Sequence, residues 1–553
     1  MTDASSRPAQ TLDPIELEVL RNALTAAAAE MDVTVWRTSR STIVREMLDY
    51  STAIYDRDGF NVAQSVRIPQ HLNSMGYALR TIVEQFIPLE RWEDGDVVIA
   101  NDPYCGGQHL PDILAFRPVF HDGARVAIVG TLCHHLDVGG MSPGSYTATA
   151  TEIYQEGLRI PPIKLFKRGV RNDEVWAMLG QNVRQTAIVL GDLQSQIASL
   201  EVGVGNVRKL AAKYGAETLT TACRALLDAS DAAMRDVIRR MPDGTYSFED
   251  FLDDDGITTD KPVRLHATVT IADERMIVDL SGSSPQVPGP INATLGSTSS
   301  AVYYAAMACA DRPIPPNAGC YRPIEIVAPE GLIVNARHPA PVAHRIAPGH
   351  RLVNVLFGAF AQAVPERMPA AYYGCSYVCS FQTETADHRR NVLVEIEIGG
   401  NGALPDEDGA SALSFGMHNN ANIPIEMIEA GMPIAFVGYG LLPGTGGSGR
   451  QRGGLGLWRE WRVDAERATF TAQMDRFRHR PYGLAGGGAG APGRLLLIRD
   501  GRTTPLHSKV SNLPLLKGDV IRLETSGGGG FGDPATRAVE AAGRDRALGY
   551  VTA

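Results

Sequence analysis

The apolar positions of residues 13–38 recur at spacings of three and four, which predicts an amphipathic helix. Asp13 is suited to cap this helix, and Pro14 fits its first turn because proline lacks the N–H that a helix leaves unpaired there. The same spacing returns over residues 193–241. Gly215 interrupts that stretch, so we predict two successive helices that pack on each other or on a sheet.

Other parts of the chain carry the shorter patterns of β-strands. Two runs of strand propensity flank residues 56–59 and predict a hairpin, with Asp49 at its entrance. Apolar runs at 97–100 and 125–131 also have the length of strands. From residue 263 onward apolar and polar residues alternate, and short strand-like runs are separated by loops and by two helical segments.

These patterns predict a mixed α/β fold of the α+β class, with a helix-and-hairpin first half and a glycine-rich, strand-rich second half. A chain of 553 residues is also too long for one ordinary hydrophobic core. We therefore predict a disordered N-terminus at 1–12, an N-terminal α/β domain at 13–260, a β-rich C-terminal region at 261–533 and a tail helix at 534–553.

The composition restricts the classes of partner. With a formal net charge of −10, the chain has no overall basic character to favour nucleic acid or an anionic membrane. It has no apolar run of about 18 residues, and its polar N-terminus lacks a secretory pattern. Seven cysteines, few and odd in number, fit a reducing compartment. We expect a cytoplasmic protein that neither binds nucleic acid nor spans a membrane.

Two compositional features have rival interpretations. The acidic residues of 249–255 lack the loop spacing of a calcium site, and we interpret them as a solvated linker. Many of the 57 glycines concentrate at 436–456, 483–493 and 526–532. These segments lack the arrangement of a nucleotide-binding loop, so they are either tight turns at domain edges or loops whose N–H groups approach an anion or substrate.

Residues 97–140 contain the densest group of possible metal ligands in the chain. His109 and Asp112 are three residues apart after a turn, and His134 ends a second strand that can lie beside the first. From spacing alone, a hydrogen-bonded surface pair and a structural histidine remain alternatives to a metal site. Imidazole and carboxylate without thiolate suit a catalytic Zn²⁺, Mn²⁺ or Fe²⁺.

The remaining histidines give weaker signals. His71 and His135 either donate hydrogen bonds to metal ligands or are ordinary hydrogen-bonded residues. His344, His350 and His418 lie in the second half of the chain, and the sequence assigns them no function.

Six separated blocks, in order along the chain, form a recognisable signature. They are REMLDYSTAIYDRDG, NDPYCGGQHLPD, CHHLDVGGMSPGS, PINATLGSTSSAVYY, NNANIPIEMIE and TSGGGGFGDP. Together they resemble the hydantoinase B/oxoprolinase family, from about residue 12 to 540. That family includes B subunits of ATP-dependent N-methylhydantoinases, the C-terminal part of 5-oxoprolinases, the β subunit of caprolactamase, and subunits of acetone and acetophenone carboxylases.

The resemblance implies a metal site made by Asp49, His109, Asp112 and His134, with zinc as the first choice of metal and manganese or iron as alternatives. Asp49 enters through the resemblance, because spacing alone does not select it. The segment 344–351 departs from the family pattern, and we expect it to contact the substrate or a partner.

The resemblance also implies a division of labour between subunits. A hydantoinase A-type partner binds ATP and phosphorylates the substrate, and the present chain has no cofactor-binding residues of its own for the nucleotide. The absence of a nucleotide-loop motif agrees with that division. The general base remains open among Glu46, Asp102, His135 and Asp137.

The expected function is that of the B subunit of an ATP-dependent amidohydrolase that opens a cyclic amide, namely a hydantoin, 5-oxoproline or a lactam. The alternative is a subunit of an ATP-dependent ketone carboxylase of the acetone or acetophenone carboxylase type. In both cases we expect a heterotetramer or a larger assembly.

Overall fold

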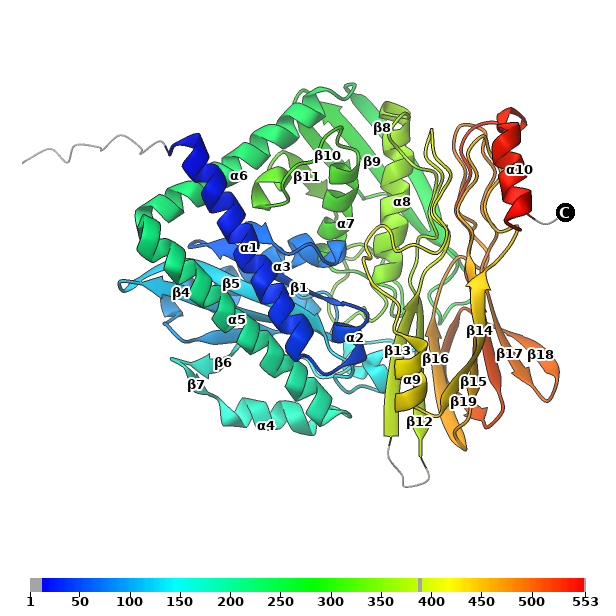
Figure 1. Cartoon of the computed structure of the whole chain (residues 1–553), viewed down its shortest axis with the longest axis horizontal. Coiled ribbons are helices and arrows are strands. Elements are labelled where there is room, and N and C mark those ends of the chain that lie inside the picture. The colour runs from blue at the N-terminus through cyan, green and yellow to red at the C-terminus, as the bar shows by residue number, and fades with distance from the viewer. Residues whose placement is uncertain (1–11, 386–389, 552–553) are drawn as a thin grey trace, which may run out of the picture.

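A seven-stranded antiparallel sheet forms the centre of the N-terminal half, with strand order β2-β1-β5-β4-β3-β6-β7 (Figure 1). The computed structural model describes residues 12–385 and 390–551, so the predicted disordered N-terminus lies, apart from its last residue, outside the described residues. The strands are β1 Tyr50–Asp56, β2 Asn61–Gln64, β3 Val97–Ala100, β4 Asp112–His121, β5 Ala124–His134, β6 Ile163–Lys167 and β7 Val170–Arg171. The predicted hairpin is confirmed as β1 and β2.

Helices cover both faces of this sheet because successive residues of a strand point to opposite sides. The helices of this half are α1 Pro14–Thr38, α2 Thr42–Arg45, α3 Pro69–Thr81, α4 Asp173–Gln181, α5 Thr186–Tyr214 and α6 Ala216–Arg239. In β1, Ile54 packs with α1 and α5, whereas Tyr55 packs with α3 on the other face. Likewise in β4, Ile113 packs with α1 and α5, and Leu114 packs with α3. In Figure 1, α1 and α5 run side by side across the near face of the sheet.

The predicted helices of the N-terminal half are confirmed. The side chain of Asp13 caps α1 by accepting a hydrogen bond from the Ile15 N–H at 3.3 Å. α5 and α6 meet at Gly215, whose φ of 87° is one that glycine adopts without strain. His71 lies in the first turn of α3, which begins at Pro69.

A second sheet, of order β11-β10-β9-β8, packs against helix α8, which in turn packs on α7. These elements are β8 Gly244–Leu252, β9 Val263–Ala272, β10 Arg275–Asp279, β11 Ile324–Val327, α7 Leu295–Ala308 and α8 Ile346–Ala363. β8 and β9 are antiparallel neighbours. One sheet therefore continues across the predicted domain boundary at residue 260.

Two further sheets and the helices α9 and α10 make up the rest of the described residues, at the right of Figure 1. The sheet orders are β13-β12-β16-β19 and β14-β15-β20-β17-β18. The elements are β12 Tyr377–Glu384, β13 Arg390–Glu397, α9 Ile425–Gly431, β14 Ile434–Leu441, β15 Leu457–Val463, β16 Arg467–Gln473, β17 Arg494–Arg499, β18 Arg502–Leu506, β19 Lys509–Leu516, β20 Val520–Glu524 and α10 Val539–Ala547. The mixed α/β class with a strand-rich second half is thus as predicted.

The glycine-rich segments pack against one another through their backbones. The Gly528 N–H donates to the Gly454 carbonyl at 2.9 Å, and the Gly447 N–H donates to the Gly528 carbonyl at 2.8 Å. Residues 526–532 are all buried. A Cβ atom on Gly528 would overlap the carbonyl group of Asn401. Glycine is therefore needed here for close backbone approach, and these N–H groups are committed to the fold rather than to an anion.

We expect Gly528→Ala to lower the free energy of unfolding by about 3 kcal/mol, because the surrounding backbone must shift to admit the methyl group. Gly543→Ala, in α10, is the matched control, since an added Cβ there meets open space and alanine favours a helix over glycine. Urea unfolding followed by circular dichroism measures both variants. Equal unfolding midpoints for Gly528→Ala and the wild type would contradict the packing argument.

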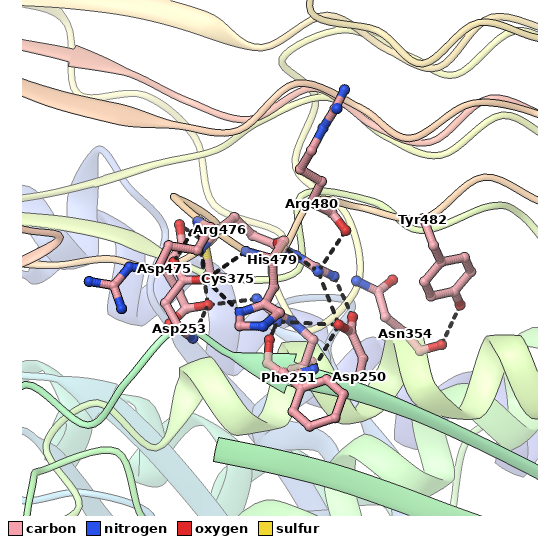
Figure 2. Close-up of polar contacts among 12 residues, drawn as sticks. Asp250, Phe251, Asp253, Asn354, Cys375, Asp475, Arg476, His479, Arg480 and Tyr482 are labelled. Atoms are coloured by element: carbon pink, nitrogen blue, oxygen red, sulfur yellow. Dashed lines mark hydrogen bonds and ion pairs between the residues drawn. The ribbon is translucent and has the colours of Figure 1, made fainter. Parts of the chain in front are cut away.

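The prediction that residues 249–255 form a solvated linker is wrong. Residues 249–252 belong to β8, and the three aspartates that follow are buried. Asp253, Asp254 and Asp255 are only 1%, 1% and 2% exposed. They follow β8 and meet groups of the C-terminal half. Figure 2 shows His479 close to Asp253, with 3.1 Å between Nδ1 and Oδ1.

Asp475 lies within the same buried ion network. It accepts hydrogen bonds from Arg351 Nη2 at 2.7 Å and from Lys509 Nζ at 3.1 Å. Nearby, Arg476 Nη2 lies 2.8 Å from Asp250 Oδ2 (Figure 2). Buried charges are tolerated only when they are paired. The network therefore fastens the end of β8 to α8, to β19 and to the segment that follows β16.

Candidate metal centre

The four predicted ligands come together at one end of the first sheet. Because β1, β5 and β4 are neighbours, Asp49 before β1, His134 at the end of β5 and Asp112 at the start of β4 form one row. Asp112 and His134 are register partners, and the His134 N–H donates to the Asp49 carbonyl at 3.1 Å. His109 lies in the turn before β4, where its carbonyl accepts from the Asp112 N–H at 3.1 Å.

Three of these side chains form a tight buried cluster. One ligand atom each from His109, Asp112 and His134 lie within 4.8 Å of one another. His109 Nδ1 is 2.8 Å from Asp112 Oδ2 without making a hydrogen bond, and Asp112 Oδ1 and His134 Nδ1 also lack partners. Buried polar atoms without partners are costly. The cluster therefore fits a divalent cation, which such lone pairs would ligate.

Two further residues orient the cluster. The Tyr146 hydroxyl lies 3.0 Å from His134 Nε2 and 3.5 Å from His109 Nε2. Arg345 Nη2 donates to Asp112 Oδ2 at 2.9 Å. Sequence reasoning did not find Tyr146. Arg345 belongs to the segment expected to contact substrate or partner, but nothing in its spacing linked it to a residue 233 positions away.

Burial sets the charge state of these groups. It lowers the pKa of His134 and of His71 to about 3, and that of His109 well below its usual value. Neutral imidazole is the form that binds metals. Burial, and then the negative charge of Asp112, raise the pKa of Asp49 to about 7. A cation between the two carboxylates would relieve this repulsion.

A cavity of about 20 Å³ adjoins the cluster. Asp49, His71 and His134 line it from the N-terminal half, and Ser376 and His418 line it from the C-terminal half. His71 Nε2 lies 3.6 Å from Asp49 Oδ1, so His71 is a neighbour of a predicted ligand. The volume is sufficient for one water molecule.

The four candidate general bases are not among the residues that line this cavity. Asp102 and Asp137 each accept a hydrogen bond from an arginine, at 2.7 and 2.8 Å respectively. His135 Nε2 lies 3.0 Å from a buried glutamine oxygen. Glu46 follows α2 at its C-terminal end and is half-buried.

Comparison with known proteins identifies the family of the chain. The profile of hydantoinase B/oxoprolinase proteins matches residues 13–534. The chain belongs to this family. Caprolactamase subunit beta of Pseudomonas jessenii is 34% identical over 550 residues, which cover 95% of this chain and 92% of that subunit. The 5-oxoprolinase of Dictyostelium discoideum is 31% identical over 530 residues, which cover 94% of this chain and 40% of that longer enzyme.

Two solved structures share the fold of this chain. The crystal structure of the ATP-dependent caprolactamase from Pseudomonas jessenii matches with a TM-score of 0.92 at 32% identity, over 98% of this chain and 95% of that one. A nucleotide-free acetone carboxylase matches with a TM-score of 0.90 over 98% of this chain and 78% of that one, but at 20% identity this likeness concerns the fold alone. Within residues 12–385 and 390–551, no helix combines the length and apolarity needed to cross a bilayer.

Proposed function

We propose that this chain is the B subunit of an ATP-dependent hydrolase of cyclic amides, with a hydantoin, 5-oxoproline or lactam ring as the substrate. The observation that carries the proposal is the buried cluster of His109, Asp112 and His134 beside a water-sized cavity. Similarity along the chain to a caprolactamase subunit and to a 5-oxoprolinase supports this class of reaction.

The proposed metal site consists of Asp49, His109, Asp112 and His134, and its donor set suits Zn²⁺, with Mn²⁺ or Fe²⁺ as alternatives. A divalent ion bound there would polarise a carbonyl oxygen and lower the pKa of water. Other residues of the chain would orient the ligands of this ion and shield them from bulk water. Arg345 fixes the Asp112 carboxylate through a 2.9 Å hydrogen bond, and burial keeps the imidazoles neutral and excludes bulk water.

We assign ATP binding and phosphorylation of the substrate to a separate hydantoinase A-type subunit, in a heterotetramer or larger assembly. The glycine-rich segments of this chain support that division, because the N–H groups of Gly447 and Gly528 are bonded within the fold. We place the assembly in a reducing cytoplasm, since all seven cysteines are free and buried.

The chain and its partner, purified together, are expected to release phosphate from ATP when N-methylhydantoin, 5-oxoproline or caprolactam is added. Each phosphate should accompany about one opened ring, measured by a phosphate assay and by mass spectrometry of the product. The complex assembled with His109→Ala is the control and should open no ring. Phosphate release that requires bicarbonate and a ketone would instead identify a carboxylase.

A further inference from the structure

Two polar residues of the C-terminal half line the cavity and have no place in the proposed metal site. Ser376 immediately precedes β12, and His418 lies in the loop before α9. Their side chains are hydrogen-bonded, with 2.7 Å between Ser376 Oγ and His418 Nε2. Ser376 is fully buried and His418 is 6% exposed. The cavity thus has proposed ligands and a serine–histidine pair in its wall.

The neighbours of His418 pack against its ring but form no hydrogen bond with Nδ1. His418 Nδ1 is buried and has no hydrogen-bond partner. The ring of His350 packs edge-on against it, with 4.2 Å between centroids. Tyr372 donates its single hydroxyl proton to the His350 carbonyl at 3.1 Å, so its oxygen accepts from His350 Nδ1 at 2.7 Å. This fixes the tautomer of His350 and, by packing, the position of the His418 ring.

Two other polar residues of the cavity wall, Tyr146 and His71, have contacts of their own. The Tyr146 hydroxyl lies between the two histidines of the cluster. His71 Nδ1 is 3.1 Å from Ser51 Oγ, and its other nitrogen faces Asp49. Burial, and then the charge of Arg345, lower the pKa of His418 to about 3, so its ring is neutral in the resting protein.

We propose that Ser376 and His418 form the proton relay of the ring-opening hydrolysis, which takes a proton from the attacking water and delivers it to the ring nitrogen. This inference rests on the proposed function. As a water oxygen bonds to the carbon of the phosphorylated amide, a water proton passes to Ser376 Oγ, the serine proton passes to His418 Nε2, and the reverse path protonates the ring nitrogen. The C–N bond then breaks with its electron pair on nitrogen, which takes the second proton of that water, and an acyl phosphate remains. A second water cleaves the acyl phosphate to carboxylate and inorganic phosphate, and both side chains end unchanged.

The test uses the complete complex with ATP and N-methylhydantoin, 5-oxoproline or caprolactam. Ser376→Ala and His418→Gln should each lower kcat about 100-fold or more, with KM and metal content unchanged, because the relay acts only in the transition state. Ser376→Thr retains a hydroxyl and should recover much of the rate. The wild-type solvent deuterium isotope effect on kcat should be lost in Ser376→Ala.

Ser380→Ala is the matched control. Ser380 is a buried serine within β12, the strand that Ser376 precedes. It donates to the Pro143 carbonyl at 2.9 Å and does not line the cavity, so this variant should keep the wild-type kcat. Wild-type kcat in both relay variants, or loss of metal from them, would overturn the relay while the hydrolase assignment stands. A covalent adduct on Ser376 would overturn it in favour of a nucleophile. If the wild-type complex opens none of the rings, the proposed function fails and the relay falls with it.

Discussion

Purified wild-type chain is expected to carry about one divalent ion, whereas His109→Ala and His134→Ala should each carry less than about a tenth of that amount. The two imidazoles and Asp112 form the tight buried cluster, and alanine removes a ligand that no neighbouring side chain replaces at that position. Elemental analysis after gel filtration measures the ion directly. Added metal should also raise the melting temperature of the metal-depleted wild type, because a ligand that binds the folded state stabilises it.

The control for these variants is His121→Ala. His121 lies at the end of β4 opposite Asp112, where its Nε2 is 3.5 Å from the exposed Asp122, so this variant should retain the metal. Asp49→Asn tests the fourth ligand separately, since Asp49 lines the cavity but stands outside the tight cluster. Full metal content in both His109→Ala and His134→Ala would reject the ligand assignment.

Asp475→Asn is expected to lower the free energy of unfolding by about 3–5 kcal/mol. The substitution removes the negative charge that pairs with Arg351 and Lys509, and both of these cations remain buried. Their next carboxylates, Asp250 and Asp254, are each 3.6 Å away and only partly compensate. Urea unfolding measures the loss. Asp464→Asn, in an exposed ion pair, is the control and should barely move the midpoint.

Asp475→Asn should also change how the free energy of unfolding depends on pH. Burial raises the pKa of Asp475, but the charges of Lys509 and Arg351 outweigh that effect and bring the pKa well below its usual range. A carboxyl group of this kind stabilises the fold above its unfolded-state pKa of about 4 and loses that contribution as the pH falls. The stability difference between wild type and Asp475→Asn should therefore be constant near neutrality and shrink below about pH 4. A difference that stays constant down to pH 3 would contradict the pairing.

Several elements could be predicted from the sequence because their information is local. The α1 helix follows from its apolar spacing and its Asp13 cap, and the β1–β2 hairpin from two strand-like runs around a turn. His109, Asp112 and His134 were likewise identifiable as possible ligands from their side-chain types and positions. The helix and the hairpin depend on residues a few positions apart, and the possible ligands on side-chain type.

Predictions that depended on distant partners were incomplete or wrong. The strand that ends at His134 was expected to lie beside the run at 97–100. That run forms β3, whereas the strand that ends at His134 is β5, which pairs with β4 and β1. Asp253 resembles a solvated charge in sequence, yet its partner His479 is 226 positions away. The glycine segments similarly meet one another only in the folded chain.

By itself, the sequence determined the family signature, the α+β class and the residues able to bind a metal. Only the tertiary structure decided that Asp112 and His134 pair across two strands, and that Ser376 and His418 line the same cavity as His134. The physical reason is that burial and hydrogen bonding select among side-chain neighbours only after the sheets have paired and packed. Spacing along the chain specifies which groups are present, and long-range packing specifies which of them meet.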